Sequence, residues 1–174
     1  MKRFILKTQL TFFPCTLCSK KYTKYISVLL FLLVTSCSHN EIFLEYRSFK
    51  KSEWERKDVA VYHVDINNTT DLFDVSLEIR NNNNYPFRNI WLFVDFQVPG
   101  ESVRTDTIGF DLADVYGKWY GKGINQYNFT APYKTGVRFP RRGIYTCSVR
   151  HGMHTNPLTG ISDIGLKISK KVNQ

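Results

Sequence analysis

The sequence predicts an all-β fold, a two-sheet antiparallel β-sandwich, behind an N-terminal signal segment. Short stretches of alternating apolar and polar residues recur at regular spacing from residue 59 onward, and turns rich in Asn, Gly and Pro separate them. The same region is rich in Phe, Tyr, Val and Ile, which β-strands favour. A jelly-roll topology is preferred over an immunoglobulin-like one, because one long connection could cross from one sheet to the other.

The expected strands share this alternation, and the one at 90–98 begins with apolar residues on both faces, as in a strand packed on two sides. In chain order the expected strands are 59–66, 75–79, 90–98, 103–110, 137–139, 144–150 and 164–168. Residues 111–133, which contain three glycines and a proline, are expected to form the long connection. Connections of this length in a compact domain are usually functional or pass between sheets.

A lipobox lies at residues 29–37, where the apolar run Leu-Leu-Phe-Leu-Leu-Val is followed by Thr-Ser-Cys. The residues before it include six basic ones and no acidic one: Lys2, Arg3, Lys7, Lys20, Lys21 and Lys24. A membrane-spanning helix needs about 20 apolar residues, whereas the run at 26–34 has nine. We therefore expect residues 1–36 to be a cleaved lipoprotein signal peptide and Cys37 to be the acylated, palmitate-bearing N-terminus. Residues 37–53 are then a lipidated tether, whose apolar part docks against the domain edge, and 54–174 form the β-sandwich domain.

The residues after Cys37 predict where the anchored protein lies. They read Ser-His-Asn-Glu, without the aspartate that retains bacterial lipoproteins on the inner membrane and without an acidic cluster for surface export. We therefore expect a lipid-anchored protein of the outer membrane, on its periplasmic face. The membrane is its first expected partner.

The net charge argues against nucleic acid as a partner. The chain carries a formal charge of +9, but removal of the six basic residues of the signal peptide leaves +3 and no basic patch. The cysteines argue against a redox or zinc site, because Cys15 and Cys18 lie in the cleaved segment. Cys147 is then left without an intramolecular partner and is expected to be a small buried apolar residue.

Two clusters of polar residues are candidates for a catalytic or a metal site. Asp106, Asp111 and Asp114 could supply a paired acid and base, but three acids in a solvated loop and edge are the more ordinary interpretation. His151 and His154 could bind a metal, but no third or fourth ligand lies nearby, so surface or edge histidines are favoured. The chain contains no nucleophile elbow or metalloprotease motif. We expect no enzyme, no cofactor and no metal site.

The cluster that most strongly indicates a binding function lies in residues 111–123, which we call the 111–123 loop. Its aromatic, acidic and basic residues suit an exposed platform for a protein partner or a sugar ring. The alternative is structural: Trp119 packs over the end of the sandwich and the glycines supply turns with positive φ. The candidate partner-binding residues are Asp111, Asp114, Trp119, Tyr120 and Lys122.

The chain resembles the gliding-motility lipoproteins of the GldH type from Bacteroidota over nearly all of its mature part. The matching residues are Arg80-Asn81-Asn82, Tyr85-Pro86-Phe87, Asn89, Asp106-Thr107, the run 117–123 (Gly-Lys-Trp-Tyr-Gly-Lys-Gly), Phe139-Pro140, Gly143-Ile144-Tyr145, His151-Gly152-Met153 and the run 158–166 (Leu-Thr-Gly-Ile-Ser-Asp-Ile-Gly-Leu). Asp106-Thr107-Ile108 also resembles the O-glycosylation acceptor of these bacteria, which makes Thr107 a candidate site.

The resemblance implies a non-catalytic component of the gliding machinery, a process linked to type IX secretion. Its expected partners are other gliding or secretion proteins of the envelope. The second hypothesis, from a different class, is an envelope-anchored glycan-binding module.

Overall fold

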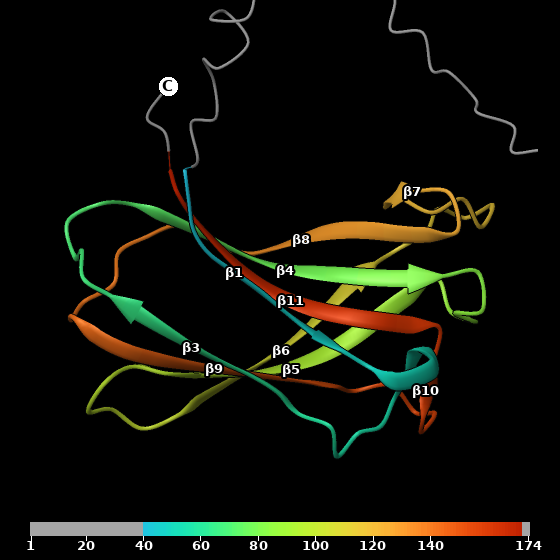
Figure 1. The fold of residues 1–174 in the computed structure, drawn as a ribbon, viewed down its shortest axis with the longest axis horizontal. Helices are drawn as coiled ribbons and strands as arrows, with labels where there is room; N and C mark the ends of the chain where they lie inside the picture. The colour runs from blue at the N-terminus through green and yellow to red at the C-terminus, as the bar shows by residue number, and fades with distance from the viewer. Residues whose placement is uncertain (1–39, 172–174) are drawn as a thin grey trace, which may run out of the picture. The chain divides into compact units, whose positions relative to one another are not determined.

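The computed structural model describes residues 40–171, and these are almost entirely β (Figure 1). In chain order the elements are β1 (Glu41–Ser48), the 3₁₀ turn η1 (Lys50–Ser52), β2 (Glu53–Trp54), β3 (Ala60–Ile66), β4 (Phe73–Asn82), β5 (Asn89–Gln97), β6 (Arg104–Asp111), β7 (Lys122–Gly123), β8 (Gln126–Val137), β9 (Gly143–His151), β10 (Leu158–Thr159) and β11 (Ile161–Lys170). Within 40–171 no helix has the length and apolar character needed to span a membrane. The expected signal peptide, with Cys15, Cys18 and Cys37, lies outside the described residues.

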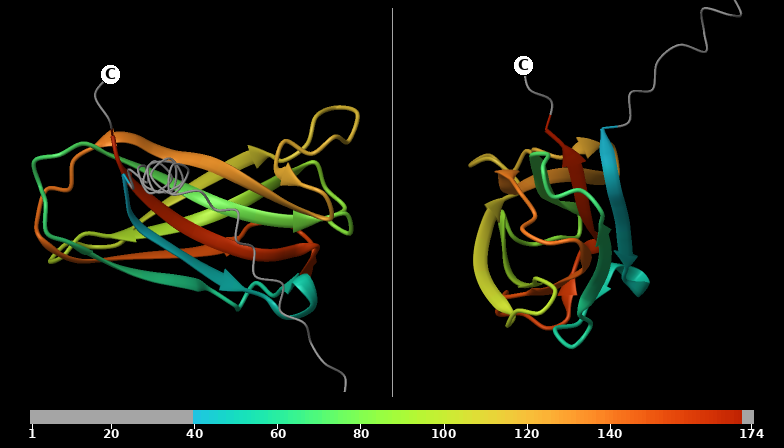
Figure 2. Two further views of the ribbon diagram at one scale, coloured as in Figure 1. Left: turned by 45° about the horizontal axis from the view of Figure 1, so that its top comes forward. Right: turned by 90° about the vertical axis from the view of Figure 1, so that its left-hand side faces the viewer.

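Two antiparallel sheets pack face to face and form a β-sandwich (Figures 1 and 2). The larger sheet has the strand order β1-β11-β4-β8-β7, and the smaller has the order β3-β9-β5-β6. The short strands β2 and β10 pair only with each other. The predicted fold class is therefore confirmed.

The topology is that of a jelly roll. Only β5 and β6 are consecutive long strands within one sheet, whereas every other connection between long strands passes from one sheet to the other. The long strands thus form two four-stranded layers, as in a jelly roll, and not the sheets of four and three strands of a constant-type immunoglobulin domain. The connection between β6 and β8 does cross between the sheets, as the sequence predicted.

The core lies between the sheets and follows the period-two pattern of the strands. In β3 every second residue from Ala60 to Ile66 is buried and the residues between them are exposed. Tyr62 donates its hydroxyl to the Ile164 carbonyl of the opposite sheet, at 2.8 Å. Cys147 is a buried free thiol, as expected, and burial is the main reason that its pKa rises to about 12.

Two strand predictions are wrong. Most of β8 lies within residues 111–133, which were expected to be irregular, and residues 137–139 do not form a separate strand because β8 ends at Val137. β8 pairs with β4 from Gln126 to Val137, and the register shifts where Pro132 and Lys134 lie opposite β4. Proline and glycine in this stretch hid the strand, because both normally mark an edge or a bulge.

The segment expected to tether the domain contains an edge strand. β1 pairs antiparallel with β11 from Glu41 to Ser48, with one register shift after Glu41. The apolar residue Phe43 packs against the core, and the side chains of Ile42 and Leu44 are exposed. The docking of this segment thus takes the form of backbone pairing along a whole strand.

The register of the larger sheet defines two opposite ends of the sandwich. At one end, which we call the N-terminal end, Glu41 pairs with Ser169, and Phe73 pairs with Lys170 and Val137. At the other, which we call the loop end, Ser48 pairs with Asp163, and Asn82 pairs with Gln126. Figure 1 shows the start of β1 beside the end of β11 at the N-terminal end, and β7 at the loop end.

Candidate functional site

The 111–123 loop lies at the loop end and begins with a tight turn that Asp114 organises. The Asp114 carboxylate accepts hydrogen bonds from the backbone N–H groups of Tyr116 (2.8 Å) and Lys118 (2.9 Å). The backbone of Asp114 also donates to the Lys118 carbonyl at 3.0 Å, and Gly117 has a φ of +83°. Asp114 is thus occupied in holding the turn that carries residues 115–118.

Large apolar side chains stand exposed on this turn and on the next one. Val115 is 74% exposed, Tyr116 is 92% exposed, and Ile124, between β7 and β8, is 86% exposed. Tyr120 is 57% exposed. The β7–β8 turn requires a glycine, because a Cβ at Gly123 would lie 1.7 Å from the carbonyl oxygen of Gln126. Val115 and Tyr116 belong to the turn that Asp114 holds, Ile124 belongs to the turn between the paired strands β7 and β8, and Tyr120 lies between the two turns in the chain.

Trp119 is half-buried and supports the loop from below. Its ring lies against those of Tyr127 (centroids 5.9 Å apart) and Tyr85 (6.3 Å), and its Nε1 donates to Oδ1 of Asn83 at 3.2 Å. Trp119 also forms a β-bridge with Ala113 across the loop. The structural interpretation of Trp119 therefore holds, since its side chain covers the end of the sandwich.

The same tryptophan lines a shallow open hollow. The hollow is formed by the 111–123 loop, β7 and the turn after β4, and its lining residues are Asn83, Gly117, Lys118, Trp119, Gly121, Lys122, Gly123 and Tyr127. Lys118 and Lys122 are exposed at this hollow, and no carboxylate lines it. The surface thus carries exposed apolar side chains on its turns and positive charges at the hollow.

The structure brings only part of the predicted site together. Trp119 and Lys122 line the hollow, and Tyr120 adjoins them in the chain. Asp111 ends β6 and lies 3.9 Å from Arg88, so that it faces another turn of the loop end. Sequence reasoning did not include Val115, Tyr116 or Ile124 among the candidate residues, although each lies within two residues of a turn-forming glycine, Gly117 or Gly123.

The three acids weighed as a catalytic set are engaged separately. Asp106 accepts a hydrogen bond from the Tyr133 hydroxyl at 2.5 Å and lies 3.2 Å from Nζ of Lys134, and mainly the tyrosine bond lowers its pKa. Asp114 holds its turn and Asp111 faces Arg88. Thr107, the candidate acceptor for O-glycosylation, is exposed on the edge strand β6.

The two histidines do not form a pair. His151 is fully buried beside the ring of Trp54, with centroids 5.3 Å apart, whereas His154 is exposed. The expectation of surface or edge histidines is wrong for His151, which is buried on the inner strand β9 and continues the inward-facing positions of that strand. Burial lowers the pKa of His151, and the charge of Arg56 lowers it further. Within 40–171 no group of three or more His, Cys, Asp or Glu residues could hold a metal.

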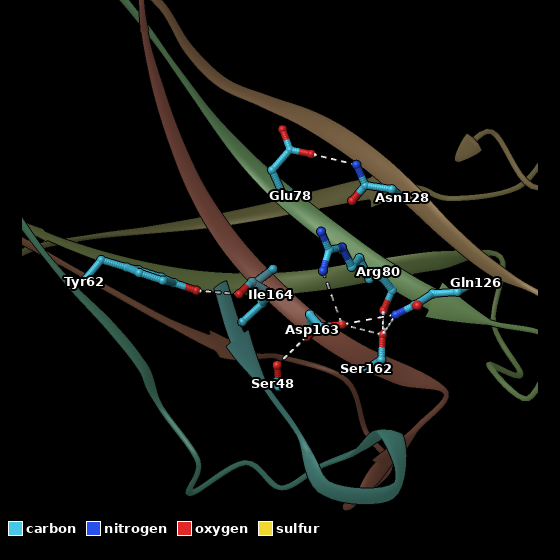
Figure 3. Close-up of polar contacts among 9 residues, drawn as sticks. All are labelled: Ser48, Tyr62, Glu78, Arg80, Gln126, Asn128, Ser162, Asp163 and Ile164. Carbon is cyan, nitrogen blue, oxygen red and sulfur yellow. Dashed lines mark hydrogen bonds and ion pairs between the residues drawn. The ribbon is translucent and has the colours of Figure 1, made fainter. Parts of the chain in front are cut away.

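A polar network that the sequence did not reveal ties four strands together beneath the loop end (Figure 3). Asp163 of β11 accepts hydrogen bonds from Ser48 of β1 (2.5 Å) and Gln126 of β8 (3.2 Å), and it lies 4.0 Å from Arg80 of β4. Ser162 adds bonds to Asp163 and to the Arg80 carbonyl. Because these groups satisfy one another's hydrogen bonds, the network holds together the strand ends from which the loops start.

A second polar cluster, around the buried carboxylate of Glu78, lies on the outer face of the sheet. Glu78 accepts hydrogen bonds from Thr130 (2.9 Å) and Asn128 (3.3 Å), and its second oxygen has no hydrogen-bond partner among residues 40–171. Tyr46 of β1 lies over this face, where a Cβ at Gly165 would be 2.8 Å from its ring and where the Arg80 guanidinium stacks 3.8 Å from its centroid. Edge strand β1 therefore covers the outer face of β4, which the alternating sequence pattern predicts to be exposed to water.

Comparisons with known proteins place these features in a family. The sequence model described as GldH lipoprotein matches residues 41–168. The chain is 29% identical over 160 residues to the gliding motility lipoprotein GldH homolog of Christiangramia forsetii, covering 87% of this chain and 98% of that protein. It is 28% identical over 154 residues to gliding motility lipoprotein GldH of Flavobacterium johnsoniae, covering 84% and 95%.

Among solved structures, a fructofuranosidase from Schwanniomyces occidentalis complexed with fructosylnystose is similar over 79% of this chain and 35% of its own. The TM-score is 0.36 at 12% sequence identity, and we conclude nothing from it. The family match covers nearly the whole described domain and agrees with the resemblance seen in the sequence. The chain therefore belongs to the GldH lipoprotein family, and its curated relatives in Christiangramia and Flavobacterium are gliding-motility lipoproteins.

Proposed function

We propose that this gliding-motility lipoprotein is a non-catalytic component of the gliding machinery that acts by binding a protein partner in the envelope. The observation that carries the proposal is the group of exposed apolar side chains at the loop end, Val115, Tyr116, Tyr120 and Ile124. The surfaces of soluble proteins seldom carry several large apolar side chains close together unless that area binds a partner. The link to type IX secretion is part of the same proposal and rests on the family resemblance.

Glu41, where β1 begins, and this surface lie at opposite ends of the domain. Cys37, the proposed acylated residue, precedes Glu41 by four residues, which span at most about 14 Å of extended chain. Glu41 is at the N-terminal end, whereas β4 runs ten residues, about 30 Å, from there to the loop end. An outer-membrane anchor on the periplasmic face would thus present the 111–123 loop toward the periplasm.

The loop end is also built to hold its surface in one conformation. The ring of Trp119 packs at an angle against those of Tyr85 and Tyr127, and the polar network centred on Asp163 ties β1, β11, β4 and β8 together. Several motifs behind the family resemblance meet here: the turn after β4, the run 117–123 and the start of β11. A surface held this way loses little conformational entropy on binding.

The chemistry of the surface indicates the kind of partner. Its apolar tips would insert into an apolar depression, and Lys118 and Lys122 would face carboxylates around it. Neither lysine forms an ion pair with a carboxylate among residues 40–171. We therefore propose a folded envelope protein with an acidic rim as the partner.

Affinity purification of the acylated protein after crosslinking in intact cells tests this proposal. Tyr116→Ala and Ile124→Ser should each reduce the captured partner, by about tenfold for a contact worth 1.4 kcal/mol, and should reduce the spreading of colonies. Ile144→Ser is the matched control, because Ile144 is 63% exposed on β9 at the N-terminal end. Partner recovery that is unchanged in both loop variants, or equally reduced in the control, would contradict the proposal.

The glycan-binding alternative rests on the exposed rings of Tyr116 and Tyr120 beside the open hollow. It predicts that the protein binds envelope polysaccharide measurably and that Tyr120→Ala abolishes this binding without changing protein partners. The same variants therefore separate the two functions.

A further inference from the structure

The sandwich is open along one side, between the edge strands β6 and β8. β6 pairs only with β5, and β7 covers the outer edge of β8 at Tyr127 and Asn128 alone. A pocket of about 440 Å³ enters the sandwich on this side. Its volume lies within the range of ordinary small-molecule sites.

The floor of this pocket is apolar and belongs to the core. Its apolar lining residues are Val75, Phe96, Val98, Val137, Phe139, Pro140 and Tyr145. Tyr145 is fixed from behind, because its hydroxyl donates to the Arg141 carbonyl at 2.8 Å and accepts from the Arg141 N–H at 3.1 Å. Phe139 packs edge-on against Tyr145, with centroids 5.0 Å apart. A preformed floor of this kind suits an apolar chain.

At the rim of the pocket, the charge that is not engaged in ion pairs among residues 40–171 is mainly positive. Its carboxylates are Asp106, bound by Tyr133 and Lys134, and Glu101, which lies 3.9 Å from Arg104 and 3.8 Å from Arg141. Arg138 is exposed at the rim and forms no ion pair with any residue in 40–171; its Nε donates to the Thr70 carbonyl. The free charge at the mouth is therefore cationic.

The pocket opens at the N-terminal end. Its lining includes Val137, which pairs with Phe73 at that end, and residues of the β5–β6 and β8–β9 turns. Glu41 begins β1 at this end and follows the proposed lipid-bearing residue Cys37 by four positions, and the inference rests on the proposed function for the source of the ligand. The apolar chains available there are those of membrane lipids.

We propose that this pocket binds the acyl chain of an anionic amphiphile, with the chain on the Val98, Val137 and Phe139 floor and the anionic head beside Arg138. A fatty carboxylate and an anionic phospholipid share this chemistry, and the position of the mouth favours the phospholipid. The head group needs one anionic charge, because Arg138 is the rim cation without an ion pair among the described residues.

Photolabelling of the full acylated protein in phosphatidylcholine vesicles tests the proposal. The probes are palmitate, phosphatidylglycerol and phosphatidylcholine, each with a diazirine in its acyl chain, and labelled peptides are mapped by mass spectrometry. We expect phosphatidylglycerol and palmitate to label the 96–98 and 137–140 segments, and phosphatidylcholine to label them several-fold less. Label confined to the anchor segment, or equal from all three probes, would overturn the proposal.

Two variants and one further arm make the result specific. Val98→Trp fills the floor and should reduce pocket labelling by about tenfold, and Arg138→Glu, at an exposed residue that can change without loss of folding, should reduce it about threefold for the anionic probes only. Undiminished labelling in Arg138→Glu contradicts the role of the rim, even if Val98→Trp fails to fold. Cys37→Ser with palmitate in solution separates the two proposals: labelling of its pocket without membrane attachment shows that the pocket binds independently of the anchor.

Discussion

Replacing Trp119 distinguishes support of the 111–123 loop from direct contact with a partner. Trp119→Ala removes two ring contacts, with Tyr127 and Tyr85, each worth about 0.5–1.5 kcal/mol, and a hydrogen bond to Asn83 worth about 1 kcal/mol. We therefore expect a loss of about 2–4 kcal/mol in the free energy of unfolding. Tyr116→Ala, at a 92% exposed side chain, should change it by less than about 0.5 kcal/mol.

Urea denaturation of the full chain, followed by circular dichroism, measures this difference. Trp119→Ala should lower the midpoint by about 1–2 M, given slopes of about 1–3 kcal/mol per molar urea for small domains. Trp119→Phe keeps a ring against Tyr85 and Tyr127 and should recover most of the loss. A midpoint for Trp119→Ala equal to that of the wild type would refute the supporting role and leave Trp119 as an exposed contact residue.

The remaining predictions concern the fold that carries the surface. Burial lowers the pKa of His151, so the unfolded chain binds a proton at this histidine more readily than the folded chain does. The free energy of unfolding should therefore fall as the pH drops below about 6.5, by up to about 1.4 kcal/mol per pH unit. Urea titrations of His151→Gln should lack this component. Gly160→Ala should lower the free energy of unfolding by more than about 3 kcal/mol, because its φ is +85° and a Cβ would lie 2.3 Å from the backbone nitrogen of Tyr85. Gly117→Ala should lower it by only about 1–2 kcal/mol, because Gly117 has a similar φ of +83° but open space around it. Equal thermal midpoints for the two variants would contradict the packing argument. Tyr62→Phe should lower the free energy of unfolding by about 1–3 kcal/mol through loss of its bond across the two sheets, and a variant as stable as wild type in urea would show that the bond contributes nothing.

The sequence predicts those parts of the fold in which burial alone decides the pattern. Alternation identifies β3, β4, β5, β6, β9 and β11, since apolar residues that lie in the core or pack against it recur at every second position of each strand. β8 escapes the same reasoning because Pro132 and Gly136 interrupt it, while its pairing partner β4 lies some fifty residues earlier in the chain. Pairing between segments so distant has no local signal.

The candidate site was predictable in place but not in composition. The glycines and aromatics of 111–123 mark the loop correctly, but only the folded chain shows that Trp119 supports it and that Tyr116 and Ile124 stand free. The burial of Glu78 depends on Tyr46, which reaches over it from β1, two strands away. His151 is buried because β9 continues its inward alternation to its last residue.

The central claim is that the loop end, opposite the start of β1, is where a partner binds. Its most direct test is site-specific photocrosslinking in living cells, with a benzoylphenylalanine placed at position 116, 124 or 144 of the full chain. We expect crosslinks to the same envelope protein from positions 116 and 124 and none from 144, which lies at the N-terminal end. Adducts from 144 alone, or an absence of protein adducts at 116 and 124, would contradict this account.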